Sequence, residues 1–192
     1  MNNGAKVLLI IIAVVVLLVG ITMMWGIGQY NKVVSMDQQI KTQWAQVENQ
    51  LKRRYDLIPN LMETVKGYAK HEKTLFENLA NARTKYFQSN TVKDKIQSSQ
   101  QLEGFLSRLL VLRETYPQLK ANENFLKFQD SLEGTENRIA VERKRYNDSV
   151  GELNTYRRTF MGRFIAAFAN VGEAQYFEVP QAEKEAPKVK FD

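Results

Sequence analysis

The feature that most constrains this chain is an uncharged apolar run at residues 7–28. A helix needs about 20 predominantly apolar residues to cross a hydrocarbon core of about 30 Å, and this run is long enough. A secretory signal peptide has a shorter apolar region, of about 7 to 15 residues, and ends at small residues. Here Met23, Met24 and Trp25 stand near the end of the run instead. The sequence therefore predicts an uncleaved, single-pass transmembrane anchor at residues 7–28, in contact with membrane lipid, after a short flank at residues 1–6.

The residues that flank the anchor bear on its placement in the bilayer. Trp25 and Tyr30 suit the membrane–water interface, where aromatic side chains are enriched. Lys6 and the amino terminus lie on one side of the run, and Lys32 and Lys41 lie on the other. Because cytoplasmic flanks carry an excess of Lys and Arg, this equal count favours neither orientation. The side of the membrane on which the rest of the chain lies stays open.

The overall composition narrows the classes of partner and of chemistry. With 27 Lys and Arg against 21 Asp and Glu, the formal charge of +6 suits anionic lipid surfaces or acidic partners. That charge is modest for a dedicated nucleic-acid binder, so we expect no nucleic-acid partner. The chain has no cysteine, which excludes disulfides, thiolate nucleophiles and cysteine metal sites.

Two apolar ladders with seven-residue spacing follow the anchor. Their members are Val33, Ile40 and Val47 in the first ladder and Trp44, Leu51 and Ile58 in the second. Such a repeat is typical of a coiled-coil-like seam between packed helices. The spacing continues beyond Pro59 and predicts a second helix that ends at about Phe87.

An apolar-poor segment at residues 88–95 predicts a loop. A third helix carries a leucine stripe through Leu112. It should end at Tyr116 and Pro117, because proline disfavours helical geometry in the residue before it.

The fourth predicted helix, at residues 122–158, is the longest of the soluble part. Asn122 is a suitable N-cap, and Glu123 lies in the first turn, where the helix dipole favours an anion. Its seven-residue ladder consists of Phe125, Leu132, Ile139, Tyr146 and Leu153. A shorter apolar segment at residues 160–171 is expected to cap the bundle.

These elements predict an all-α fold. We expect an N-terminal transmembrane helix followed by an antiparallel up-and-down four-helix bundle with long helices, at residues 29–172. Residues 173–192 are expected to form a charged extended tail, because the segment is rich in charge and interrupted by proline.

The stretch LKRRYDLIPNL, at residues 51–61, places cations, an aspartate and a proline inside one helical pattern. Pro59 lacks a backbone donor, so the helix must kink there or restart with the proline in its first turn. Asp56 is the expected cap of that restart. A buried arginine in this stretch would need a carboxylate partner. Glu142 and Asp56 are the candidate partners.

The basic residues allow two interpretations. In one, they lie on solvated helix faces and form one structural ion pair, as most surface charges do. In the other, they form a docking patch for a protein partner or anionic lipid. The residues of that candidate patch are Lys52, Arg53, Arg54, Arg143, Lys144, Arg145, Arg157 and Arg158.

No pattern in the sequence predicts a chemical step, a cofactor or a metal. His71 begins HEKTL, but Leu75 stands where the zinc-protease signature HExxH needs its second histidine. We therefore expect no catalytic, cofactor-binding or metal-binding residues, and we expect His71 to make hydrogen bonds on a helix surface. Asn147 and Asn154 lie one heptad apart beside the seam, where polar residues set register or partner choice.

Several segments together resemble the LemA family of bacterial membrane-anchored proteins. They are QYNKVV, QLKRRYDLIPNLMETVKGYAKHE, NAR, YPQLKANENF and TENRIAVERKRYNDSVGELN. The resemblance covers about residues 29–154. The positions that match family motifs include Asp56, Pro59, Asn60, Tyr116, Pro117, Asn122, Tyr146 and Asn147. The chain departs from the family after Phe160, where Met161 and Gly162 replace the usual Phe-Pro.

The resemblance implies a helical bundle beside the bacterial cytoplasmic (inner) membrane and no enzymatic activity. It also implies a scaffold or adaptor for envelope proteins, with a membrane metalloprotease as one partner class and self-association into a homo-oligomer as another possibility. The alternative is a lipid-facing, self-associating protein that organises the membrane through basic helix faces.

Overall fold

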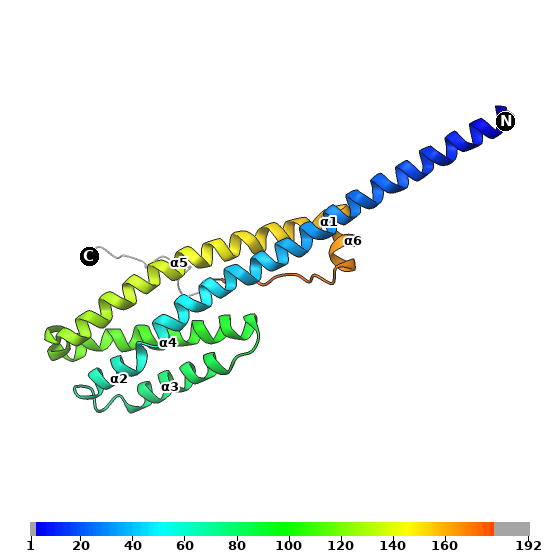
Figure 1. Cartoon of the computed structure of the whole chain (residues 1–192). Helices are drawn as coiled ribbons and strands as arrows, with labels where there is room; N and C mark the ends of the chain where they lie inside the picture. Colours follow the sequence, from blue (N-terminus) through cyan, green and yellow to red (C-terminus); the bar gives the residue numbers. More distant parts are fainter. Residues whose placement is uncertain (1–2, 179–192) are drawn as a thin grey trace, which may run out of the picture. The chain divides into compact units, whose positions relative to one another are not determined.

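The computed structural model describes residues 3–178, which fold into helices without a strand in that range (Figure 1). The elements are α1 (Asn3–Tyr55), α2 (Ile58–Lys66), α3 (Lys73–Gln88), α4 (Val92–Thr115), the 3-10 helix η1 (Pro117–Ala121), α5 (Glu123–Arg158) and α6 (Phe160–Phe168). The predicted all-α bundle with a long apolar N-terminal helix is confirmed. Most of the predicted charged tail lies outside the described residues.

The described residues form two compact units. The anchor unit comprises residues 3–42 and 149–174, and the bundle unit comprises residues 43–148 and 175–178. Helices α1 and α5 each contribute to both units. The boundaries at residues 28 and 172 that the sequence indicates stay predictions.

The anchor unit begins with the apolar part of α1. Among the described residues, this is the one helix long and apolar enough to cross a membrane, and its most apolar window is entirely exposed. Beyond that window, Val33 and Ile40 of α1 and Val150 and Leu153 of α5 are buried. The Tyr156 hydroxyl donates to Gln29 Oε1 at 3.2 Å. The end of α5 therefore lies against α1 just after the apolar run.

The bundle unit has its core along the predicted ladders. Val47 and Leu51 of α1 and Leu132 and Ile139 of α5 are buried, as the seven-residue spacing predicts. Thr135 is buried between the apolar positions of α5 because its hydroxyl donates to the Leu132 carbonyl at 2.8 Å. An internal hydrogen bond thus allows a polar residue in the ladder.

Helices α3 and α4 pack side by side in this unit (Figure 1). The Ser89 and Ser98 hydroxyl groups lie 3.2 Å apart between them. The rings of Tyr55 and Tyr86 pack edge to face with centroids 4.8 Å apart, which brings the end of α1 against α3.

The restart at Pro59 is confirmed, but its predicted cap is wrong. Helix α1 ends at Tyr55, and α2 begins at Ile58 with Pro59 in its first turn. The N-cap position is Leu57, which makes no side-chain capping bond. Asp56 instead accepts from Lys52 Nζ at 2.8 Å and from Arg83 Nη2 at 3.2 Å. These cations hold the pKa of the Asp56 carboxyl below its usual value.

The predicted second helix is two helices separated by a turn at residues 67–72. Gly67 caps α2, and glycine in a helix interior costs about 1 kcal/mol relative to alanine. Two tertiary hydrogen bonds hold the turn. The Tyr116 hydroxyl donates to Glu72 Oε1 at 3.4 Å, and Asn122 Nδ2 donates to the Tyr68 hydroxyl at 3.0 Å. The expectation that His71 lies on a helix is also wrong, because His71 is exposed in this turn.

The predicted loop at residues 88–95 is shorter than expected, because α4 begins at Val92. The Thr91 hydroxyl accepts from the Asp94 backbone N–H at 3.1 Å, a side-chain cap that apolar spacing does not reveal. The two other predicted ends are confirmed. Helix α4 ends before Tyr116, and Asn122 Oδ1 caps α5 by accepting from the Phe125 N–H at 3.0 Å.

Candidate functional site

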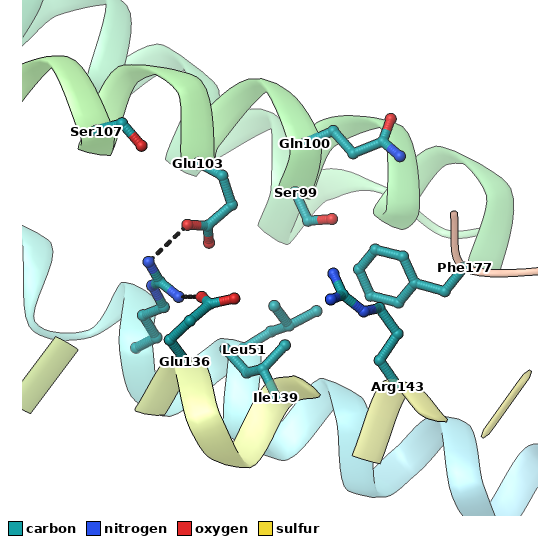
Figure 2. Close-up of a pocket in the computed structure, with 10 residues that line it drawn as sticks. Leu51, Ser99, Gln100, Glu103, Ser107, Glu136, Ile139, Arg143 and Phe177 are labelled. Carbon is teal, nitrogen blue, oxygen red and sulfur yellow. Dashed lines mark hydrogen bonds and ion pairs between the residues drawn. The ribbon is translucent and has the colours of Figure 1, made fainter. Parts of the chain in front are cut away.

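Arg54 is buried in the bundle unit and joins three of its helices. It stands in the last turn of α1, with its side chain only 9% exposed. Its Nη2 lies 2.7 Å from Glu103 Oε2 of α4, and its Nη1 pairs with Glu136 of α5. Figure 2 shows Glu103 reaching this cluster from the green helix and Glu136 from the yellow helix. One buried guanidinium therefore fixes the register of α1, α4 and α5.

The predicted partners of a buried arginine, Glu142 and Asp56, are wrong. Glu142 accepts instead from Arg145 Nη1 at 2.9 Å on the same helix. Heptad spacing indicates which face of a helix is buried, but it does not identify the neighbouring helix. The contribution of Glu103 from α4 could not be inferred from the ladders of α1 and α5.

A pocket of ≈ 330 Å³ opens beside this ion-pair cluster. Its polar lining includes Arg54 and Arg143 as cations and Glu103 and Glu136 as anions (Figure 2). Within residues 3–178, no three His, Asp or Glu side chains are grouped so as to hold a metal ion.

Residues 175–178 form an extended segment, here called the C-terminal strap, that is held through its main chain. Asn147 Nδ2 donates to the Phe177 carbonyl at 3.0 Å, while Asn147 Oδ1 accepts from the Phe177 N–H at 2.8 Å. The Tyr146 hydroxyl donates to the Gln175 carbonyl at 2.7 Å, and Gln100 Nε2 donates to the Glu178 carbonyl at 2.9 Å. These four bonds do not depend on which side chains the strap carries.

The Phe177 side chain is the apolar anchor of the strap. Its ring is buried beside Trp44, with centroids 6.2 Å apart. The Arg143 guanidinium lies over the ring at 5.8 Å, and Phe177 forms one wall of the pocket (Figure 2). The Trp44 ring also packs edge to face on Tyr146, at 5.4 Å. Burial at this position raises the pKa of Tyr146 to about 12.

In the anchor unit, Asn154 makes the same pair of main-chain hydrogen bonds that Asn147 makes in the bundle unit. Asn154 Nδ2 donates to the Ala174 carbonyl at 2.9 Å, and Asn154 Oδ1 accepts from the Ala174 N–H at 3.1 Å. Sequence reasoning selected Asn147 and Asn154 but missed the segment that they bind. The two asparagines one heptad apart were the available signal. Their partners are main-chain atoms, which have no signature in the sequence.

The predicted docking cations on α1 differ in their surroundings. Lys52 is exposed and paired with Asp56, whereas Arg54 is buried in the ion-pair cluster. Arg53 lines a separate hollow together with Asp130 and Arg138 of α5. The structure therefore does not present these three neighbours on one surface.

The predicted docking cations on α5 are mostly accessible. Lys144 is exposed and 2.8 Å from Asp148, and Arg145 is exposed and bonded to Glu142. Arg143 lies over the strap. Arg157 is half-buried and Arg158 is exposed, both in the anchor unit.

Comparison with known proteins gives consistent results. The LemA family profile matches residues 43–191. The chain is similar to Protein LemA of Metamycoplasma hominis, with 23% identity over 172 residues that cover 88% of this chain and 78% of the relative. It is also similar to Magnetosome protein MamQ of Magnetospirillum gryphiswaldense, with 22% identity over 203 residues and coverages of 92% and 74%. Magnetosome protein MamQ 2 of Paramagnetospirillum magneticum is 22% identical over 176 residues, with coverages of 78% and 65%.

Proposed function

The chain belongs to the LemA family, and from this premise we propose that it is a non-enzymatic scaffold or adaptor of the bacterial inner membrane. Residues 7–28 anchor it in the bilayer, and its bundle unit recruits other proteins of the cell envelope. The observation that carries the proposal is the hold of the bundle unit on an extended polypeptide segment.

The strap contacts are those of a peptide-binding surface. The Asn147 amide satisfies both polar groups of one residue, as a neighbouring β-strand would, and further side chains reach main-chain carbonyls. Binding through the main chain gives affinity for extended segments, and a pocket for one side chain gives specificity. The Phe177 position between Trp44 and Arg143 is such a pocket. This combination supports protein recruitment.

The anchor supports the membrane part of the proposal. The apolar window of α1 is exposed along its whole length, which is costly in water and favourable in lipid. One of the similar proteins is named as a component of the magnetosome, and such a relative is consistent with a role at a bacterial membrane.

The pocket supports a structural role in place of a chemical one. Its central Arg54 is paired with Glu103 and Glu136, an arrangement that fixes the positions of helices.

A membrane metalloprotease is one partner class within this proposal, because the family resemblance implies it. A second candidate function is a lipid-facing, self-associating protein that organises the membrane. The exposed cations Lys144 and Arg145 on α5 favour it, since cations near an anionic surface each contribute about 1 kcal/mol of attraction.

Photo-crosslinking in living cells tests the proposal. A crosslinking amino acid is placed separately at Arg53 and at Arg145 in the full chain, and the adducts are identified by mass spectrometry. Lys73, an exposed lysine on α3, serves as the control position. The adaptor proposal predicts one reproducible protein adduct at Arg53 or Arg145 that is absent at Lys73. Adducts only to lipid or to other copies of the chain would overturn it in favour of the second candidate.

A further inference from the structure

Helix α6 exposes its large apolar side chains. Phe160 and Phe168 are 75% and 85% exposed, and Met161 and Phe164 are also exposed. The buried residues of this helix are the small Gly162 and Ala166. Whether this segment caps the bundle stays a prediction. A soluble monomer rarely exposes such a concentration of large apolar groups without an interaction partner.

The position of α6 within the anchor unit indicates what covers this face. The Phe168 ring packs edge to face on Tyr30, with centroids 6.1 Å apart. A hollow of ≈ 620 Å³ is lined by Gly26, Ile27 and Tyr30 of α1 and by Phe164 and Phe168 of α6. Helix α6 therefore lies beside the last turn of the apolar run (Figure 1).

Depth along α1 can be worked out from helix geometry. From Gly26 to Tyr30 the axis advances about 6 Å at a rise of ~1.5 Å per residue. The headgroup region adds about 5 to 8 Å on each side of the hydrocarbon core. If residues 7–28 cross the bilayer, the Tyr30–Phe168 contact and the hollow beside Gly26 lie at the boundary between acyl chains and headgroups.

We propose that α6 is an interfacial helix that inserts its Phe164 and Phe168 face into the bilayer crossed by residues 7–28. The sequence of α6, FMGRFIAAF, has no acidic residue, and its Arg163 is exposed. Lys32 Nζ lies 5.4 Å from the centroid of the Tyr156 ring, at the same end of the unit. Aromatic side chains bordered by cations suit the apolar depth and the phosphates of a lipid surface.

The chain fixes α6 at both ends, so its exposed face has a defined direction. The Thr159 hydroxyl accepts from the Gly162 N–H at 3.1 Å and donates to the Tyr156 carbonyl at 2.7 Å. At the other end, Asn170 has a φ of 54°, and the Val171 N–H donates to the Ala166 carbonyl at 2.9 Å. This is a closed, left-handed helix end.

Gly162 makes the sharp entry into α6 possible. A Cβ on this residue would lie 2.1 Å from the Tyr156 carbonyl oxygen and 2.5 Å from the Thr159 hydroxyl. Because the closest obstacle is main chain, a larger residue would have to move α6. The glycine thus contributes directly to the placement of the lipid-facing side chains.

Spin labelling tests the inference, since the chain has no cysteine of its own. Single variants Phe164→Cys, Phe168→Cys and Lys73→Cys of the full chain are labelled in liposomes of phosphatidylethanolamine and phosphatidylglycerol. Electron paramagnetic resonance then measures collisions with oxygen, which concentrates in lipid, and with a nickel chelate, which stays in water. We expect a high ratio of oxygen to nickel collisions at 164 and 168 and a low ratio at 73.

Two results would overturn the inference. If the oxygen-to-nickel collision ratios at positions 164 and 168 equal the ratio at position 73, α6 lies in water. If the labels at 164 and 168 are shielded from both reagents, protein covers this face of α6. A Phe164→Trp variant in a Trp25→Phe and Trp44→Phe background checks the result without a label, because brominated lipid should quench its fluorescence. The outcome is independent of the adducts at Arg53 and Arg145, so this inference and the proposed function fail separately.

Discussion

The ion-pair cluster around Arg54 allows a prediction about which member is most costly to remove. The Arg54 side chain is 9% exposed, whereas Glu103 and Glu136 are 25% and 49% exposed. When Arg54 is replaced by methionine, both carboxylates can turn towards water and the buried charge is removed. When both glutamates become glutamine, the guanidinium stays buried without a compensating charge.

The exposed fractions of these three side chains determine how much stability each variant should lose. Breaking a buried pair so that a charge is left uncompensated costs about 3–5 kcal/mol, which we expect for the Glu103→Gln/Glu136→Gln double variant. Glu136→Gln alone should cost about 1 kcal/mol or less, since this carboxylate is half exposed and Glu103 still pairs with the arginine. Arg54→Met should lower the free energy of unfolding by an intermediate amount, about 1–2 kcal/mol. The loss of stability in the double variant should exceed the sum of the losses in the two single glutamate variants, because the three groups share one network.

Denaturant unfolding of the full chain in detergent micelles measures these differences. Trp44 is buried in the bundle unit and reports its unfolding once Trp25→Phe removes the other tryptophan. An Arg54→Met/Glu103→Gln/Glu136→Gln triple variant is the matched control and should be close in stability to Arg54→Met. If Arg54→Met destabilises the bundle unit as much as the double variant or more, the uncompensated charge of Arg54 is not what makes the double variant costly.

Three further predictions follow from other contacts. The Tyr86 hydroxyl is buried without a hydrogen-bond partner among residues 3–178, so Tyr86→Phe should leave the stability at pH 7 unchanged or raise it by up to about 1 kcal/mol. Burial raises the pKa of Tyr86, so above the unfolded pKa of about 10 the phenol ionises more readily in the unfolded chain, and the free energy of unfolding falls as pH rises. The Phe variant should therefore lose less stability between about pH 9 and 11, as measured by denaturant unfolding at each pH. Asn147→Ala should speed hydrogen exchange at the Phe177 amide, while exchange in α3 stays unchanged; equal rates at Phe177 would show that the asparagine does not hold the strap. Gly162→Ala should displace α6 and lower the oxygen-to-nickel ratio at a label on residue 168, with Trp44-monitored unfolding unaltered; an unchanged ratio would mean that the turn accommodates the methyl group.

The helix ends were predictable where a single residue determines local geometry. Pro59 has no backbone donor, Pro117 restricts Tyr116, and Asn122 offers a side-chain acceptor to the first turn of α5. Each of these signals acts within four residues and can be read from the sequence. The break at Gly67 was missed because apolar spacing continues across it, and distant contacts from Tyr116 and Asn122 hold the turn.

The candidate site was predictable only in part. The sequence indicated that a buried arginine needs a carboxylate, but the identity of Glu103 and Glu136 depends on which helices become neighbours. The strap was missed because Asn147 binds main-chain atoms of Phe177, which every residue possesses. The exposed face of α6 was missed because an apolar segment fits a protein core and a lipid surface equally well. Whether the basic residues dock a partner stays a prediction.

If this chain is a membrane-anchored adaptor, it holds another protein of the envelope in a stable complex. Native mass spectrometry of the full chain, extracted from its own membranes with a lipid-retaining polymer, tests this most directly. We expect a complex that contains a second polypeptide in fixed stoichiometry. Masses that correspond only to whole multiples of this chain, with or without bound lipid, would contradict it.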